Sequence, residues 1–158
     1  MKSMKNQKGF SLVELLVVVI IIAIVAAIAI PNLLASRRAA NEASAISSLR
    51  TYHSAEATYQ ATLGGNVNYG TAAQLGTAQL VDPVLGAASA SKSGYLFQVA
   101  VTTPQIYCAT GAPTTPGVTG TRSFGVSQPG VIYAVDDENV ACAASTGVIT
   151  GTGVTPIQ

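Results

Sequence analysis

Apolar residues are distributed very unevenly along this chain of 158 residues. Residues 15–30 are sixteen consecutive apolar positions, and no charged residue occurs between Glu14 and Arg37. About 20 residues of helix, rising about 1.5 Å each, cross the hydrocarbon core of a bilayer. The stretch is therefore long enough to span a membrane. Because it is apolar all round, we expect a helix that is surrounded by lipid or by other protein.

The pattern becomes amphipathic after Pro31, where the missing backbone N–H is expected to kink the helix. We predict that the helix starts at Phe10 and ends at residue 62 or 63, before the helix-stopping Gly64. Arg38 and Glu42 lie one turn apart and are expected to form a weak pair. A narrow stripe, spaced by three and four, should face a small sheet: Ala35, Ala39, Ala43, Ile46, Leu49, His53, Ala57 and Gln60. His53 is interpreted as a packed, hydrogen-bonded histidine rather than a ligand or catalyst.

Strand-like alternation appears in the second half of the chain. Four strands are predicted, joined by turns that contain Pro or Gly: residues 95–101, 105–109, 122–127 and 131–135. A further edge strand is expected near residues 148–149. The glycine-rich connector before the sheet should hold one short helix, residues 74–80, and is a candidate contact surface because of its length. The fold class is thus α+β: a long N-terminal helix packed on a four-stranded antiparallel meander.

The N-terminal stretch allows three interpretations. A basic leader before an apolar run is typical of a secretory signal peptide, with a small-residue cleavage site at residues 27–29, but the run is longer than usual. A plain membrane anchor gives no reason for Glu14, since a carboxylate costs roughly 2.5–3.5 kcal/mol at the bilayer centre and less near the interface. The third interpretation rests on Gly9, Phe10, Glu14, the apolar run and Pro31 taken together.

That combination, KGFSLVELLVVVIIIAIVAAIAIP, resembles the class III signal of type IV pilins and pseudopilins of the N-methylphenylalanine type. The resemblance implies that a prepilin peptidase cuts between Gly9 and Phe10 and that the new amine of Phe10 is methylated. It divides the chain into a cleaved leader (1–9), an apolar helix half for the membrane or filament core (10–36) and an extracytoplasmic pilin-like domain (37–158).

In this family the N-terminal segment also mediates the assembly of subunits into a filament. The methylated amine of Phe10 remains a cation, and it can pair with Glu14 of a neighbouring subunit in an apolar filament core. Because a buried charge without a partner is strongly disfavoured, the pair would favour one register of subunits. In relatives, the helix before the residue that corresponds to Pro31 can loosen in the filament, so Pro31 is included among the expected assembly residues.

Charge and cysteine content narrow the possible partners. Charged residues make up 9% of the chain. Removal of residues 1–9 takes away three of the eight basic residues, which leaves five Lys and Arg against seven Asp and Glu, a net charge of about −2. Nucleic acid is therefore not an expected partner. Cys108 and Cys142, expected outside the cytoplasm, should form a disulfide; two free thiols are the alternative.

The sequence shows little catalytic chemistry. It contains one histidine and neither a G-x-S-x-G motif nor a P-loop, so we expect no enzyme and no cofactor. Asp136, Asp137 and Glu138 form its one acidic cluster, and oxygen ligands of this kind can bind calcium. The EF-hand spacing is absent, however, and a solvated turn is the preferred interpretation. No metal is assigned.

The function implied by the resemblance is that of a structural subunit of a type IV pilus. Its expected partners are other copies of the chain, the prepilin peptidase, the pilus assembly machinery and, before assembly, the inner membrane. The expected location is the inner membrane and then an extracellular surface filament. Two alternatives stay open: a pseudopilin of a type II secretion system in the periplasm, and a minor tip pilin that binds DNA or a host ligand.

Overall fold

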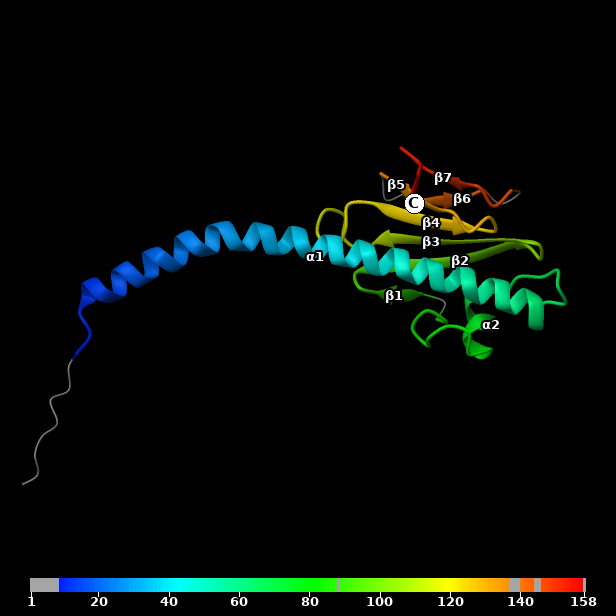
Figure 1. The fold of residues 1–158 in the computed structure, drawn as a ribbon, viewed down its shortest axis with the longest axis horizontal. Coiled ribbons are helices and arrows are strands. Elements are labelled where there is room, and N and C mark those ends of the chain that lie inside the picture. Colours follow the sequence, from blue (N-terminus) through cyan, green and yellow to red (C-terminus); the bar gives the residue numbers. More distant parts are fainter. Residues whose placement is uncertain (1–8, 88, 137–139, 144–145, 158) are drawn as a thin grey trace, which may run out of the picture. The chain divides into compact units, whose positions relative to one another are not determined.

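The computed structural model describes residues 9–87, 89–136, 140–143 and 146–157. Contacts between residues divide the chain into two units, Met1–Ser36 and Arg37–Gln158, which are treated separately below. The helix α1 (Leu12–Thr62) has residues in both units (Figure 1). It begins two residues later than predicted and ends where predicted.

In the first unit, α1 is continuous through Pro31. Proline cannot donate to the carbonyl four residues earlier, and its ring crowds the preceding turn. Next to it, the side-chain Nδ2 of Asn32 donates to the carbonyl oxygen of Ile28 at 3.2 Å. Pro31 therefore lies inside the helix without ending it.

The second unit contains an antiparallel sheet of six strands in the order β1-β2-β3-β4-β5-β8. These are β1 (Ala90–Lys92), β2 (Tyr95–Thr103), β3 (Ile106–Pro113), β4 (Ser123–Ser127), β5 (Ile132–Val135) and β8 (Thr155–Ile157). The α+β class is confirmed, and the four central strands correspond to the predicted meander. The predicted count of four strands is wrong, because a short strand extends the sheet at each edge. The strand expected near residues 148–149 is β7 (Ile149–Thr150), which pairs with β6 (Ala141–Cys142) outside this sheet.

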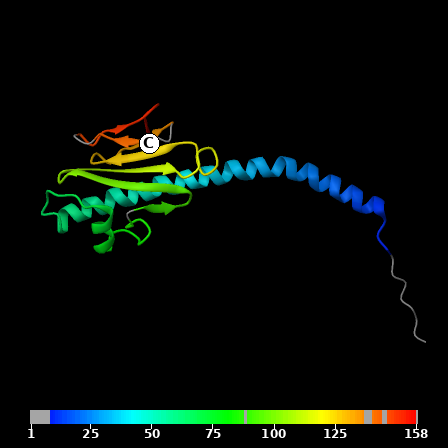
Figure 2. The same ribbon diagram turned by 180° about the vertical axis from the view of Figure 1, so that it is seen from behind.

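Within the second unit, residues 37–62 of α1 cross one face of the sheet, as the opposite views of Figures 1 and 2 show. Leu49 and Tyr52 of the helix pack with Phe97 and Phe124 of the sheet in the main core. The buried helix positions are Glu42, Ala45, Ser48, Leu49, Tyr52, Ala55 and Glu56. The predicted stripe is therefore wrong except at Leu49 and at the partly buried Ile46, His53 and Gln60.

The β6–β7 hairpin covers the part of the other face of the sheet that is formed by β3 and β4. Cys108 of β3 and Cys142 of β6 form a disulfide, with Cα atoms 6.3 Å apart. A Cβ on Gly125 of β4 would come within 2.8 Å of the side chain of Ile149 in β7. The absence of a side chain at Gly125 thus lets the hairpin approach closely, and β4 is buried along its whole length.

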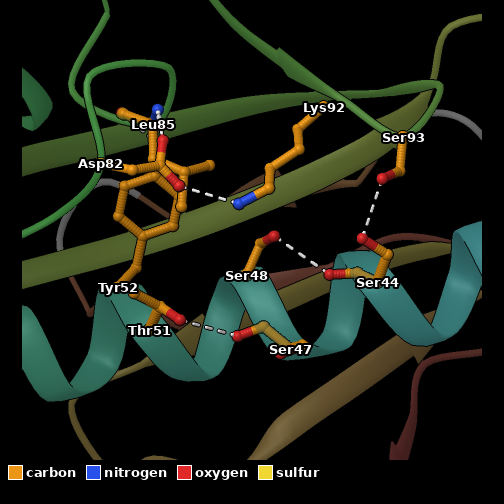
Figure 3. A network of polar contacts seen from close by, with 9 residues as sticks. All are labelled: Ser44, Ser47, Ser48, Thr51, Tyr52, Asp82, Leu85, Lys92 and Ser93. Atoms are coloured by element: carbon orange, nitrogen blue, oxygen red, sulfur yellow. Dashed lines mark hydrogen bonds and ion pairs between the residues drawn. The ribbon is translucent and has the colours of Figure 1, made fainter.

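The connector between α1 and the sheet contains α2 (Ala72–Thr77), slightly earlier than predicted. Thr71 and Gln74 form a capping box at its start, which satisfies otherwise unpaired amides. Figure 3 shows how the second half of the connector is fixed: the Tyr52 hydroxyl donates to the Leu85 carbonyl at 2.6 Å, and the Asp82 carboxylate pairs with Lys92 at 2.8 Å.

Candidate assembly segment

The segment that carries the predicted cleavage site precedes α1 directly. Gly9 is exposed, and a Cβ placed on it would meet nothing within 4 Å. Phe10 is 83% exposed. The peptide bond between them is therefore accessible at the level of a single chain, and neither residue contributes to a core within its unit.

Glu14 caps the start of α1. Its Oε2 accepts a hydrogen bond from the backbone N–H of Ser11 at 2.9 Å. Ser11 is the residue before the helix, and Glu14 is the third residue of the helix. The S-x-x-E spacing is that of a capping box, which consists of two reciprocal hydrogen bonds. Here the bond from the Ser11 backbone N–H to the Glu14 side chain is formed. The carboxylate also lies at the positive end of the helix dipole. The sequence reasoning missed this local role, although the spacing Ser11–Glu14 signals it.

The large apolar side chains from Leu12 to Leu34 have nothing to pack against within the unit, and between 47% and 78% of each is exposed. Among the described residues, α1 is the one helix whose length and composition would allow it to cross a membrane. Exposure of this much apolar surface is strongly unfavourable in water. The segment is therefore built for contact with lipid or with other protein chains.

Arg38 and Glu42, which follow this segment, do not form the pair expected from their spacing. Arg38 donates from Nη1 to the carbonyl of Gly117 at 3.1 Å, and Glu42 pairs with Arg122 rather than with Arg38. The carboxylate of Glu42 also accepts from the backbone N–H and the hydroxyl of Thr121 at 2.9 and 2.8 Å. Although burial opposes the charge, these donors and Arg122 lower the pKa of Glu42. The partners are 79 and 80 residues away, so helix spacing could not reveal them.

The remaining candidate residues lie in the second unit. The ring of His53 is partly buried and its Nδ1 is 2.6 Å from the Tyr107 hydroxyl, which confirms the packed, hydrogen-bonded interpretation. Asp136 follows β5, and its backbone N–H donates to the Thr152 carbonyl. Asp137 and Glu138 lie outside the described residues. Within the described part of the chain, no group of three His, Cys, Asp or Glu side chains could hold a metal ion.

Comparison with known proteins finds similarity in this same N-terminal part of the chain. The family described as the prokaryotic N-terminal methylation motif matches residues 4–30. Over 39 residues the chain is 51% identical to the type IV wide pilus major component PilA4 of Thermus thermophilus. That match covers 25% of this chain and 30% of the Thermus protein. No solved structure matches the chain.

A class III signal followed by a long apolar helix and an α+β domain with an antiparallel sheet defines a pilin-like protein. The N-terminal signal of the chain is similar to that of type IV pilins and pseudopilins, and its α+β fold is pilin-like.

Proposed function

We propose that this chain is a structural subunit of a type IV pilus. In this proposal the precursor is held in the inner membrane by the apolar half of α1, cut between Gly9 and Phe10, and methylated at the amine of Phe10. The mature subunit then polymerises through the same helix half into a surface filament. The observation that carries the proposal is the exposed apolar surface from Leu12 to Leu34, most of which lies within the methylation motif matched at residues 4–30. The role is structural, and no catalysis is assigned.

Glu14 would specify the register of the filament. Its Oε2 accepts a hydrogen bond from the Ser11 amide within the subunit, and its other oxygen has no hydrogen-bond partner among the described residues. No other charged residue occurs from Gly9 to Ser36. In an apolar filament core, the methylated amine of a neighbouring Phe10 would therefore be the matching cation, and a slipped register would leave both charges buried and unpaired. Pro31 would let the helix adjust as subunits pack.

The test is a Glu14→Gln variant. A glutamine at this position can still accept the Ser11 N–H, as in capping boxes with Gln, so the helix start is retained while the charge is lost. We expect processed subunits in the membrane and a loss of filaments from the sheared cell-surface fraction of at least about tenfold, which corresponds to about 1.4 kcal/mol.

The matched control is Ser11→Ala, which removes the side chain of the capping residue and keeps the charge of Glu14. Filament yield should stay close to that of the unmodified chain. Normal filaments from Glu14→Gln would refute the role of the charge. If processed subunits of the unmodified chain were found only in the membrane fraction, the proposed pilus would be wrong. The chain would then be assigned to the short periplasmic assembly of a pseudopilin.

A further inference from the structure

Glu56 is a carboxylate enclosed within the second unit. The residue is 0% exposed, on the face of α1 that packs against the rest of the unit. Its Oε2 accepts the backbone N–H of Gly70 at 2.8 Å. Its Oε1 is buried and has no hydrogen-bond partner among the described residues. A group of this kind is costly when it is ionised, because its side chain is shielded from bulk solvent and forms no ion pair among the described residues.

The partner of Glu56 belongs to a short surface turn, which we call the connector turn (residues 64–70). Gly64 and Gly70 at its two ends are buried, and residues 65–68 between them are exposed. Gly70 lies against the ring of Tyr59, since a Cβ there would be 3.1 Å from ring carbons. Next to it, the N–H of Tyr69 donates to the carbonyl of Pro104 at 2.7 Å. The Gly70–Glu56 bond therefore holds the C-terminal end of the turn on the helix.

The surroundings of Glu56 contain other titratable groups, but no Lys or Arg of the described residues forms an ion pair with it. They are His53 on α1, Tyr107 on β3 and Tyr69 in the connector turn; the rings of Tyr69 and Tyr107 are 4.6 Å apart. Burial raises the pKa of Tyr107, so that this group stays neutral in the physiological range. The two ion pairs of the described residues, Lys92–Asp82 and Arg122–Glu42, do not include Glu56.

We propose that Glu56 is a proton-dependent latch for the connector turn: the neutral carboxyl group holds Gly70 on the helix, and loss of its proton promotes opening of the turn to water. The latch rests on contacts within the second unit and does not depend on the proposed pilus function. As a consequence of the latch, the surface formed by the exposed residues 65–68 would be ordered at acidic pH and more mobile at neutral pH.

The direction follows from linkage. Burial raises the pKa of Glu56 from 4.5 to about 7, and the hydrogen bond from Gly70 offsets only part of this rise. Below pH 4.5 the carboxyl group is protonated in both the closed and the open turn. As pH rises from there to about 7, the open form ionises first, so opening becomes up to tenfold easier per pH unit. Above about pH 7 both forms are ionised, and the effect levels off.

Hydrogen exchange of the full-length chain in detergent micelles tests the latch. Deuterium uptake of peptides that cover residues 64–71 is measured by mass spectrometry from pH 4.5 to 8 and corrected for the intrinsic pH dependence of exchange. We expect the opening constant of the connector turn to rise by roughly two orders of magnitude and then to level off. A peptide that contains Thr121, whose amide is held by Glu42, provides the internal reference and should not follow this rise.

Three variants make the result specific. Glu56→Gln keeps an acceptor for Gly70 but cannot ionise, and its connector turn should show no pH dependence. Glu42→Gln changes the other buried carboxylate of α1 and should keep the profile of the unmodified chain. His53→Gln should keep it as well, which matters because histidine can change charge in the same pH range. A flat profile in the unmodified chain, an unchanged profile in Glu56→Gln or a flat profile in His53→Gln would each overturn the proposal.

Discussion

The two halves of α1 have the same backbone conformation and opposite relations to their surroundings. From Leu12 to Ser36 the helix exposes large apolar side chains on every side, and Glu14 is its one charged residue. From Arg37 to Thr62 the helix buries Leu49 and Tyr52 completely. The second half also places two carboxylates, those of Glu42 and Glu56, on its buried face.

This contrast shows that the second half of α1 makes its contacts within the chain, whereas the first half leaves its apolar surface open to contacts with other molecules. In the second half, the apolar side chains pack against the sheet, and Glu42 accepts a hydrogen bond from Thr121 and forms an ion pair with Arg122. In the first half, apolar surface of similar chemistry has no packing partner among the described residues of its unit, and contact with lipid or with other chains would remove the cost of its exposure in water. In the proposed function, this exposed surface is the part of the helix that contacts lipid and then neighbouring subunits.

The largest effect is expected from a charge in the middle of the first half. Ile22→Asp would cost roughly 2.5–3.5 kcal/mol in a membrane or filament core, so surface filaments should be lost. Ser47→Asp is the matched change at an exposed position of the second half and should leave filament yield within about twofold. Immunoblots of the sheared fraction measure both. Wild-type yield from Ile22→Asp would show that the first half does not need an apolar environment.

Removal of the disulfide should give the next largest effect. With Cys108→Ser and Cys142→Ser combined, the unfolding free energy of the second unit should fall by about 3–4 kcal/mol, because the cross-link closes a loop of 34 residues. Denaturant unfolding of the full chain in detergent measures the change. If the double variant were as stable as the unmodified chain, the β6–β7 hairpin would need no covalent tie to the sheet.

Truncation of one leucine in each half sharpens the comparison. Leu49→Ala removes a fully buried side chain and should lower the unfolding free energy by about 3 kcal/mol through lost burial and a cavity. Leu16→Ala, at a side chain that is 53% exposed, should leave it unchanged. The same denaturant titration compares them. Equal losses would show that Leu16 is packed in the folded subunit.

The smallest effect concerns pH. The pKa of Glu42 is lowered in the folded chain, so its stabilisation is present above about pH 4.5 and is lost as pH falls through the lower folded-state pKa. The loss should be at most about 1 kcal/mol, because the side chain of Arg122 is 45% exposed and water screens the pair. Glu42→Gln should remove this acid-dependent loss. Thermal melts from pH 6 to 3 measure it, and identical slopes in both chains would contradict it.

The sequence allowed the prediction of features that depend on neighbours along the chain. The apolar run, the glycines after Thr62 and the alternation from Tyr95 specify elements locally, and these elements form as expected. The edge strands β1 and β8 were missed, because Ala90–Lys92 lacks an apolar pattern and Pro156 argues against a strand interior.

The buried stripe of α1 was missed for a different reason. Alanine and serine occur on several faces of this helix, so the apolar pattern did not decide which face is buried. The correct face includes Glu42 and Glu56, whose burial depends on Thr121, Arg122 and Gly70. Only the three-dimensional structure brings those partners together. In contrast, the Ser11–Glu14 capping pattern was readable from the sequence and was overlooked.

The most direct test of the account is the intact mass of the protein in the sheared cell-surface fraction. The account predicts a chain that begins at Phe10, one methyl group heavier and, because of the Cys108–Cys142 disulfide, two hydrogens lighter than its sequence. A chain that begins at Ile30 would indicate cleavage after residues 27–29 by ordinary signal peptidase. Glu14 and most of the apolar half of α1 would then be absent from the mature protein, and their role in assembly would be contradicted.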